Sequence, residues 1–160
     1  MTTSGLSWRD PDVLWASLLG VGFAPRAPGT WGTFAAAVLW WYLLAPLAWW
    51  IQVAVIVVYF VTGWWASERI TKRYGVSDAP EIVADEVAGM WLALLFAPQS
   101  VLWVGIGILV FRMLDIAKPG PIGWLDHNLK GGLGVMLDDM LAGLLVCALL
   151  AWLPGVMGIA

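Results

Sequence analysis

Titratable side chains are concentrated in one stretch of this chain, Phe111 to Gly143, whereas the sequence around it is mostly apolar. The stretch interleaves charged and strongly polar residues with Gly and Pro: Arg112, Asp115, Lys118, Asp126, His127, Asn128, Lys130, Asp138 and Asp139. Carboxylates and cations beside apolar helices suit a divalent metal ion and a phosphate group better than they suit a hydrophobic core. Residues 112–139 are therefore expected to form the catalytic segment.

Two pairs of adjacent acids are candidates for metal binding. Asp85 and Glu86 are expected one turn into an apolar helix, and Asp138 and Asp139 open the last apolar segment. Carboxylate oxygens suit Mg²⁺, and acids that enter a membrane helix are costly and usually functional. The alternatives are acids that stabilise a helix start, or an N-cap at Asp138. Because neighbouring helical residues point ~100° apart, Asp138 and Asp139 are expected to have unequal roles.

The cations Arg112 and Lys118 are candidates for holding a phosphate. Arg offers a bidentate fork to phosphate oxygens, and Lys offers a point charge. Lys118 precedes Pro119, so it should lie just past a helix end and be free to reach a ligand. Arg112 and Asp115 are three residues apart and share a helix face, so an intrahelical ion pair is the alternative interpretation of these two.

A second polar segment, residues 24–32, is expected to be a loop because it contains Pro25, Pro28, Gly29 and Gly32. Its Gly residues permit close approach of the backbone to a ligand. Thr30 could donate to a phosphate at a helix N-terminus, although a rigid turn with an N-cap is equally compatible. His127 is the only histidine of the chain, which excludes a histidine-based metal site.

The composition indicates how these residues are positioned. The chain has 160 residues, of which 61% are hydrophobic and 12% charged, and its mean hydropathy is +0.84. Soluble domains usually carry about 25% charged residues, so we expect one integral-membrane domain over residues 1–160. Cys147 is the only cysteine, which excludes an intrachain disulfide or a cysteine-based zinc site.

The hydropathy pattern predicts an all-α, polytopic membrane protein. Residues 11–23 are too short to span and are expected to form an interfacial helix. About five short or full transmembrane helices should follow, near residues 33–46, 50–69, 81–98, 101–118 and 138–154. A polar loop is expected at residues 71–80, between the second and third of them.

Charges fall on one side of this predicted zigzag. Every Asp, Glu, Lys and Arg lies at one set of helix ends, whereas the connections around Pro46 and Pro98 and the C-terminus carry none. Membrane proteins keep Lys and Arg on the cytoplasmic side. The catalytic segment and the N-terminus should therefore face the cytoplasm, and the C-terminus should lie outside.

With these residues in place, the sequence resembles the phosphatidylglycerophosphatase A family. The matching motifs are PRAPGTWGT, IVADE followed by GMW, FRMLDIAKPGPI and WLDHNLKGGLGVMLDDMLAG, which cover residues 25–143 in family order. The resemblance implies a Mg²⁺-dependent membrane phosphatase that removes the terminal phosphate of phosphatidylglycerophosphate to leave phosphatidylglycerol. It implies functional roles for Thr30, Asp85, Glu86, Arg112, Asp115, Lys118, Asp126, Asn128, Asp138 and Asp139. His127 stands where the family pattern has an Arg, so the expected phosphate contact moves to Lys130.

The resulting hypothesis assigns a role to each group of site residues. The expected catalytic residues are Asp85, Arg112, Asp115, Lys118 and Asp139; the expected metal ligands are Asp85, Glu86, Asp115, Asp138 and Asp139; the expected substrate contacts are Gly29, Thr30, Asp126, Asn128 and Lys130. The expected partners are the lipid substrate and the bacterial cytoplasmic (inner) membrane, with no nucleic acid. The residues leave open the number of metal ions, the oligomeric state, and whether water or an Asp attacks phosphorus.

Two other classes of protein are compatible with an acidic cluster in a membrane. A divalent-cation transporter needs polar groups at several depths, and here they crowd one end of each span. A non-catalytic membrane subunit explains the apolar body but leaves the acids and bases without a role.

Overall fold

The computed structural model describes residues 5–76, 79–129 and 131–156, and over these ranges its regular structure is entirely helical. The all-α class is thereby confirmed. In chain order the elements are α1 (Pro11–Ala16), the 3₁₀ turn η1 (Val21–Phe23), α2 (Pro28–Leu39), the π-helical η2 (Trp40–Leu44), α3 (Trp49–Tyr74), α4 (Ala84–Leu94), α5 (Val101–Ala117), α6 (Pro121–Asn128) and α7 (Gly132–Val156).

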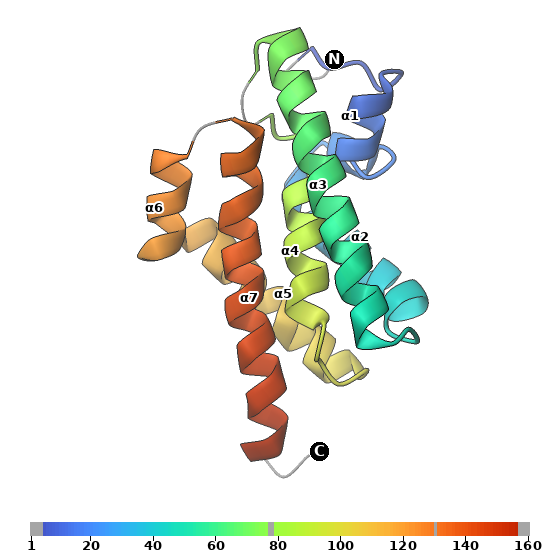
Figure 1. Ribbon diagram of the computed structural model, residues 1–160, viewed down its shortest axis with the longest axis vertical. Helices are drawn as coiled ribbons and strands as arrows, with labels where there is room; N and C mark the ends of the chain where they lie inside the picture. Colours follow the sequence, from blue (N-terminus) through green and yellow to red (C-terminus); the bar gives the residue numbers. More distant parts are fainter. Residues whose placement is uncertain (1–4, 77–78, 130, 157–160) are drawn as a thin grey trace.

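Helix α4 is the centre of the bundle and packs against α2, α3, α5 and α7. Figure 1 shows α3, α4 and α7 running side by side along the long axis of the molecule. Small residues allow α4 and α7 to approach closely, because a Cβ at Gly143 would overlap the backbone carbonyl of Gly89. The site acids that these two helices carry are therefore held on a tightly packed pair.

Two helices of the described chain, α3 and α7, are long and apolar enough to cross a membrane. They contain 26 and 25 residues, whereas α5 has 17, α4 has 11, and α2 has 12 before it continues into η2. The predicted number of five spans is therefore not confirmed. Helix α4 begins only at Ala84 and is capped at Leu95, so it is shorter than the predicted span over residues 81–98.

The N-terminal third differs from the prediction in two places. The helix expected over residues 11–23 ends at Ala16, because Leu18, Leu19 and Gly20 adopt positive φ before η1 begins. The loop expected over residues 24–32 is shorter than predicted, because α2 begins at Pro28. Proline is well suited to the first helical position, where its missing N–H would have no intrahelical partner.

The helices around the catalytic segment also begin and end at unexpected positions. Helix α3 continues beyond Arg69 to Tyr74, so part of the predicted 71–80 loop is helical. Helix α6 was not predicted. Helix α7 begins at Gly132, so Asp138 lies well inside it and the N-cap interpretation of Asp138 is wrong. This early start is compatible with close packing, because a Cβ at Gly132 would lie 2.8 Å from the backbone nitrogen of Glu68 in α3.

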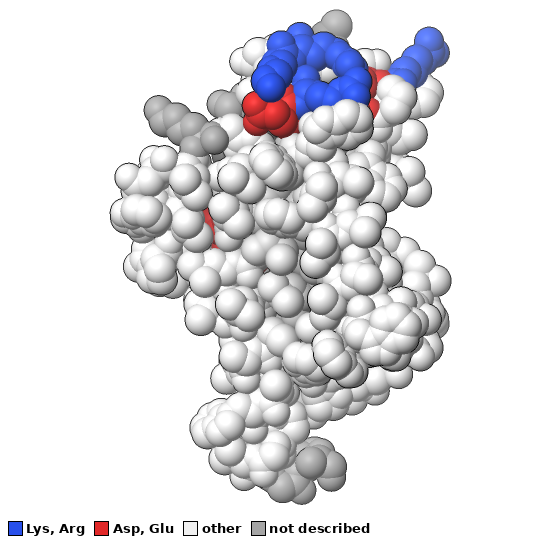
Figure 2. Space-filling model, viewed as in Figure 1, with Lys and Arg blue, Asp and Glu red and all other residues white. Residues whose placement is uncertain are grey.

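Charged side chains gather at one end of the molecule, over α1 and the end of α3, and most of the face in Figure 2 carries none. Asp10 caps α1 and also accepts hydrogen bonds from Arg73 and Tyr74. Arg69 pairs with Asp12 at 3.1 Å. These contacts fasten the N-terminal helix to α3 beside the site.

Candidate active site

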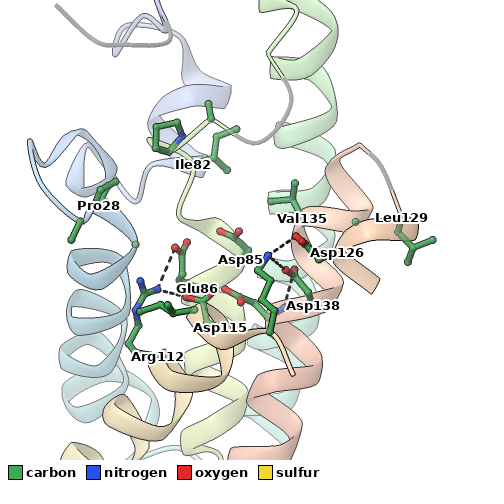
Figure 3. A pocket seen from close by; sticks show the side chains of 18 of the residues that line it. Pro28, Ile82, Asp85, Glu86, Arg112, Asp115, Asp126, Leu129, Val135 and Asp138 are labelled. Atoms are coloured by element: carbon green, nitrogen blue, oxygen red, sulfur yellow. Dashed lines mark hydrogen bonds and ion pairs between the residues drawn. The ribbon is translucent and has the colours of Figure 1, made fainter. Parts of the chain in front are cut away.

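A polar cavity of about 550 Å³ opens among the helix ends nearest the charged end of the molecule. Its walls come from the start of α2, the first turn of α4, the end of α5, and α6 and α7. Figure 3 shows the side chains of Asp85, Glu86 and Asp115 pointing into it, with Arg112 beside Glu86 and Asp115. Lys118 also lines the cavity. Acids and bases separated by up to 54 positions in the sequence thus share one cavity.

Three carboxylates form the core of this cavity, and we call Asp85, Glu86 and Asp139 the acid triad. One oxygen from each lies within 4.8 Å of the others. Asp85 Oδ1, Glu86 Oε2 and Asp139 Oδ2 are buried and have no hydrogen-bond partner among the described residues. Buried carboxylates that repel one another and lack donors are strongly unfavourable unless a cation compensates them. The donor set, all oxygen, fits Mg²⁺.

The local structure explains why these three acids meet. Asp85 and Glu86 lie in the first turn of α4 itself, rather than one turn into it, and the preceding Val83 is buried and donates its N–H to Ala16 O at 2.9 Å. Asp139 is buried in α7, and a Cβ at Gly89 would lie 2.6 Å from its carbonyl oxygen. The triad is therefore held by backbone packing between α4 and α7.

Arg112 joins α5 to the triad. Its Nη1 lies 3.6 Å from Glu86 Oε1 and also donates to Asp115 on the same helix. The intrahelical ion pair is therefore present, but Arg112 contacts the triad as well. Its Nε is buried without a partner among the described residues, so the guanidinium retains donors for an anionic ligand.

Lys118 connects the ends of three helices. It lies just past the end of α5, as predicted, and caps that helix with a left-handed backbone, φ 43°. Its Nζ donates to Asp138 Oδ2 of α7 at 2.7 Å and to Asp126 of α6. Burial alone would lower the pKa of Lys118, but these two hydrogen bonds outweigh it and raise the pKa, so the ammonium is charged at neutral pH.

The adjacent acids of α7 therefore have different partners. Asp138 is the partner of Lys118, and Asp139 belongs to the acid triad. The ~100° offset of neighbouring helical residues predicts such a division. The partner of Asp138 is an ammonium group, and not the helix N-terminus that the sequence suggested.

The predicted substrate contacts are only partly brought together. Gly29 and Asp126 line the cavity. Thr30 is exposed on α2, and Asn128 is exposed on α6, where its amide donates to Trp124 O at 2.7 Å. Lys130 lies outside the described residues.

Other lining residues were not predicted from the sequence. They come from the connection before α4 and from the start of α7: Ala79, Pro80, Ile82, Gly134 and Val135. All are apolar or lack a side chain, so their residue types did not indicate a role in binding or catalysis.

Gly29 offers a test of this geometry. A Cβ there would overlap Glu86 Oε1 and lie 3.1 Å from Arg112 Nη1. Because the carboxylate is the far end of a flexible side chain, Gly29→Ala should displace Glu86 rather than unfold the protein. We expect activity to fall by about tenfold or more, with the melting temperature nearly unchanged. The matched control is Gly155→Ala in α7, where a Cβ would meet no described atom within 4 Å; equal activity of the two variants would contradict the expected role of Gly29.

Comparisons with known proteins agree with the motifs that carry the resemblance. Residues 14–154 match the model of a family described as phosphatidylglycerophosphatase A. A protein of that name from Escherichia coli is 38% identical over 148 residues, covering 92% of this chain and 86% of the relative. Another from Haemophilus influenzae is 36% identical over 140 residues, covering 87% and 86%. A putative phosphatidylinositol-3-phosphatase from Bacteroides thetaiotaomicron is 37% identical over 154 residues, covering 89% and 95%. No solved structure matches.

Proposed function

The chain belongs to the phosphatidylglycerophosphatase A family, and from that premise we propose that it is a Mg²⁺-dependent lipid phosphomonoesterase. The reaction is hydrolysis of phosphatidylglycerophosphate to phosphatidylglycerol and inorganic phosphate. One observation supports this most: three carboxylates, each with a buried oxygen that has no hydrogen-bond partner among the described residues, share a cavity with Arg112 of α5 and Lys118 at its C-cap. Such a site provides for both a divalent cation and a phosphoryl group.

In this proposal the acid triad holds Mg²⁺. Asp85 and Glu86 present oxygens from α4, and Asp139 presents one from α7. Asp115 lies close enough to Asp139 and Glu86 to interact with both, so it borders the metal position. When bound, Mg²⁺ supplies polarisation of the phosphoryl group and compensation of its negative charge.

The cations hold the phosphate. Arg112 lines the cavity and is oriented by Asp115 and Glu86, and its buried Nε has no partner among the described residues. Lys118 uses two of its three N–H donors on Asp126 and Asp138 and keeps the third for a phosphoryl oxygen. Fixed donors of this kind stabilise the charge that develops in the transition state.

The structure supports a location in the membrane. Helices α3 and α7 are long enough to span it, and their exposed side chains include Val57, Val58, Val61, Leu144 and Trp152. Exposed apolar surface of this extent marks contact with lipid. We propose a multi-pass protein of the bacterial cytoplasmic membrane in which α3 and α7 traverse the bilayer, the shorter α2, α4 and α5 pack within the same bundle, and the cavity lies on the cytoplasmic side.

This orientation predicts the accessibility of single cysteines in whole cells. A cysteine that replaces the exposed Lys72 should react only with membrane-permeant thiol reagents, because it lies at the charged, cytoplasmic end. A reporter fused after residue 160 should behave as extracytoplasmic. Cys147 is buried and should contribute little background. Labelling of the Lys72 position by an impermeant reagent would reverse the orientation.

The identity of the substrate headgroup is tested by comparing two phospholipids. Phosphate release by the purified protein should be much faster from phosphatidylglycerophosphate than from phosphatidylinositol 3-phosphate. Both lipids carry a phosphomonoester on a polyol, and the second is suggested by the printed description of the Bacteroides relative. A preference for the inositol lipid would support the proposed phosphatase chemistry but would assign a different substrate to the protein. Release from neither lipid would reject the phosphatase in favour of a transporter or a non-catalytic subunit.

A further inference from the structure

A second cavity, of about 430 Å³, is an apolar groove between two helical segments. One wall is α2 with η2, and the other is α5. We call it the α2–α5 groove; its lining includes Phe34, Val38, Trp41, Val101, Gly105 and Ile108. Phe34 and Val38 are exposed, so the groove opens on the outer surface of the bundle, where the bilayer would lie.

Small residues create the space in this groove. Ala37 lies in one wall and Gly105 in the other, and a Cβ built at Gly105 would meet no described atom within 4 Å. Glycine inside a helix destabilises the helix relative to alanine. A glycine that is not needed for helix packing, at a position lining a groove, indicates that the space itself is used.

The groove and the polar cavity share the same two helices. Gly29 at the start of α2 and Arg112 near the end of α5 line the polar cavity, and a Cβ on Gly29 would lie 3.1 Å from Arg112 Nη1. Ile108, in the groove, is one helical turn from Arg112. Val101, at the far end, is 11 residues from Arg112 in the sequence, or ~16 Å along the helix. The groove therefore starts beside the phosphate-binding cations and leads away from them.

We propose that the α2–α5 groove binds one acyl chain of the phospholipid substrate whose phosphate occupies the polar cavity. This inference rests on the proposed function. A lipid joins its headgroup covalently to its chains, so a phosphate among Arg112 and Lys118 requires an apolar path leading out of the site. The other side of the polar cavity is lined by α6 and α7, whose charged Asp126 and Asp138 both accept hydrogen bonds from Lys118. The α2–α5 side provides apolar side chains that lead away from Arg112 as far as Val101.

The test fills the groove and compares two substrates that differ only in their tails. Gly105→Leu places a branched side chain in the open space of α5. With dipalmitoyl phosphatidylglycerophosphate, kcat/KM should fall about tenfold, as expected when roughly two methylenes lose their apolar contacts. With the dibutyryl form, whose chains are too short to follow the groove, kcat/KM should stay within about twofold. Val38→Trp fills the groove from the opposite wall and should give the same chain-length dependence.

Gly155→Leu is the matched control, because this helical glycine of α7 also has no described atom within 4 Å of a built Cβ and is exposed. It should change neither substrate's kinetics. Equal effects of Gly105→Leu on both substrates, or no effect on either, would overturn the acyl-chain site while the phosphatase stands. A change of oligomeric state in Gly105→Leu, without chain-length dependence, would assign the groove to a second copy instead. No hydrolysis of either lipid by the wild-type protein would reject the proposed function and this site with it.

Discussion

Asp139→Asn should reduce phosphate release by about three orders of magnitude, because it removes a formal charge and a ligand from the acid triad. Asparagine has nearly the same shape, so the packing of α4 against α7 should survive. The Mg²⁺-dependent rise in melting temperature expected of the wild-type protein should also disappear, since a cation that binds only the folded state stabilises it.

Asp138→Asn is the matched control, with the same chemical change one residue earlier in α7. Asp138 accepts from Lys118 at 2.7 Å, so its loss should weaken the positioning of the ammonium and leave the Mg²⁺ effect on melting in place. We expect the activity of this variant to fall by only about tenfold. Equal, complete loss of activity in both variants, each folded, would contradict the division of roles between the two acids.

Arg112→Lys should cut kcat by about two to three orders of magnitude while leaving the Mg²⁺ concentration for half-maximal activity nearly unchanged. Lysine keeps the positive charge that faces Glu86 and Asp115 but loses the bidentate fork. Loss of one charged transition-state contact is worth roughly 2–4 kcal/mol. Phosphate release measured against Mg²⁺ and against lipid concentration separates the two effects.

Asp115→Asn should show the opposite pattern to Arg112→Lys. It removes a negative charge that borders the acid triad, so more Mg²⁺ should be needed for half-maximal activity. A shifted metal requirement in Arg112→Lys together with an unshifted one in Asp115→Asn would mean that the two residues exchange roles.

The sequence contained enough information to predict the helical class and the acids and bases of the site. Asp85, Glu86, Arg112, Asp115, Lys118, Asp126, Asp138 and Asp139 all line the cavity. They are recognisable because charges are rare in a chain that is 61% hydrophobic, and each charge near an apolar segment requires a partner or a function.

Helix boundaries near the site were less predictable. Pro28 was interpreted as a loop residue although it begins α2, and α7 begins at Gly132 rather than at Asp138. In both cases Gly and Pro indicated a turn, whereas packing against a neighbouring helix favours the helical conformation. The pairing of Asp138 with Lys118 depends on the position of α6 and on the left-handed backbone at residue 118. A hydropathy pattern predicts neither the short helix nor the backbone conformation of a single residue.

The Mg²⁺ dependence of phosphate release by the purified protein tests the central claim most directly. Wild-type protein in detergent micelles with phosphatidylglycerophosphate should release inorganic phosphate when Mg²⁺ is present. Phosphate release should stop when a chelator removes the ion and resume when excess Mg²⁺ is added back. Three carboxylates that each keep a buried oxygen without a hydrogen-bond partner among the described residues need a cation to hold a phosphate beside them. Phosphate release that continues at the same rate in the chelator would contradict a metal site at Asp85, Glu86 and Asp139.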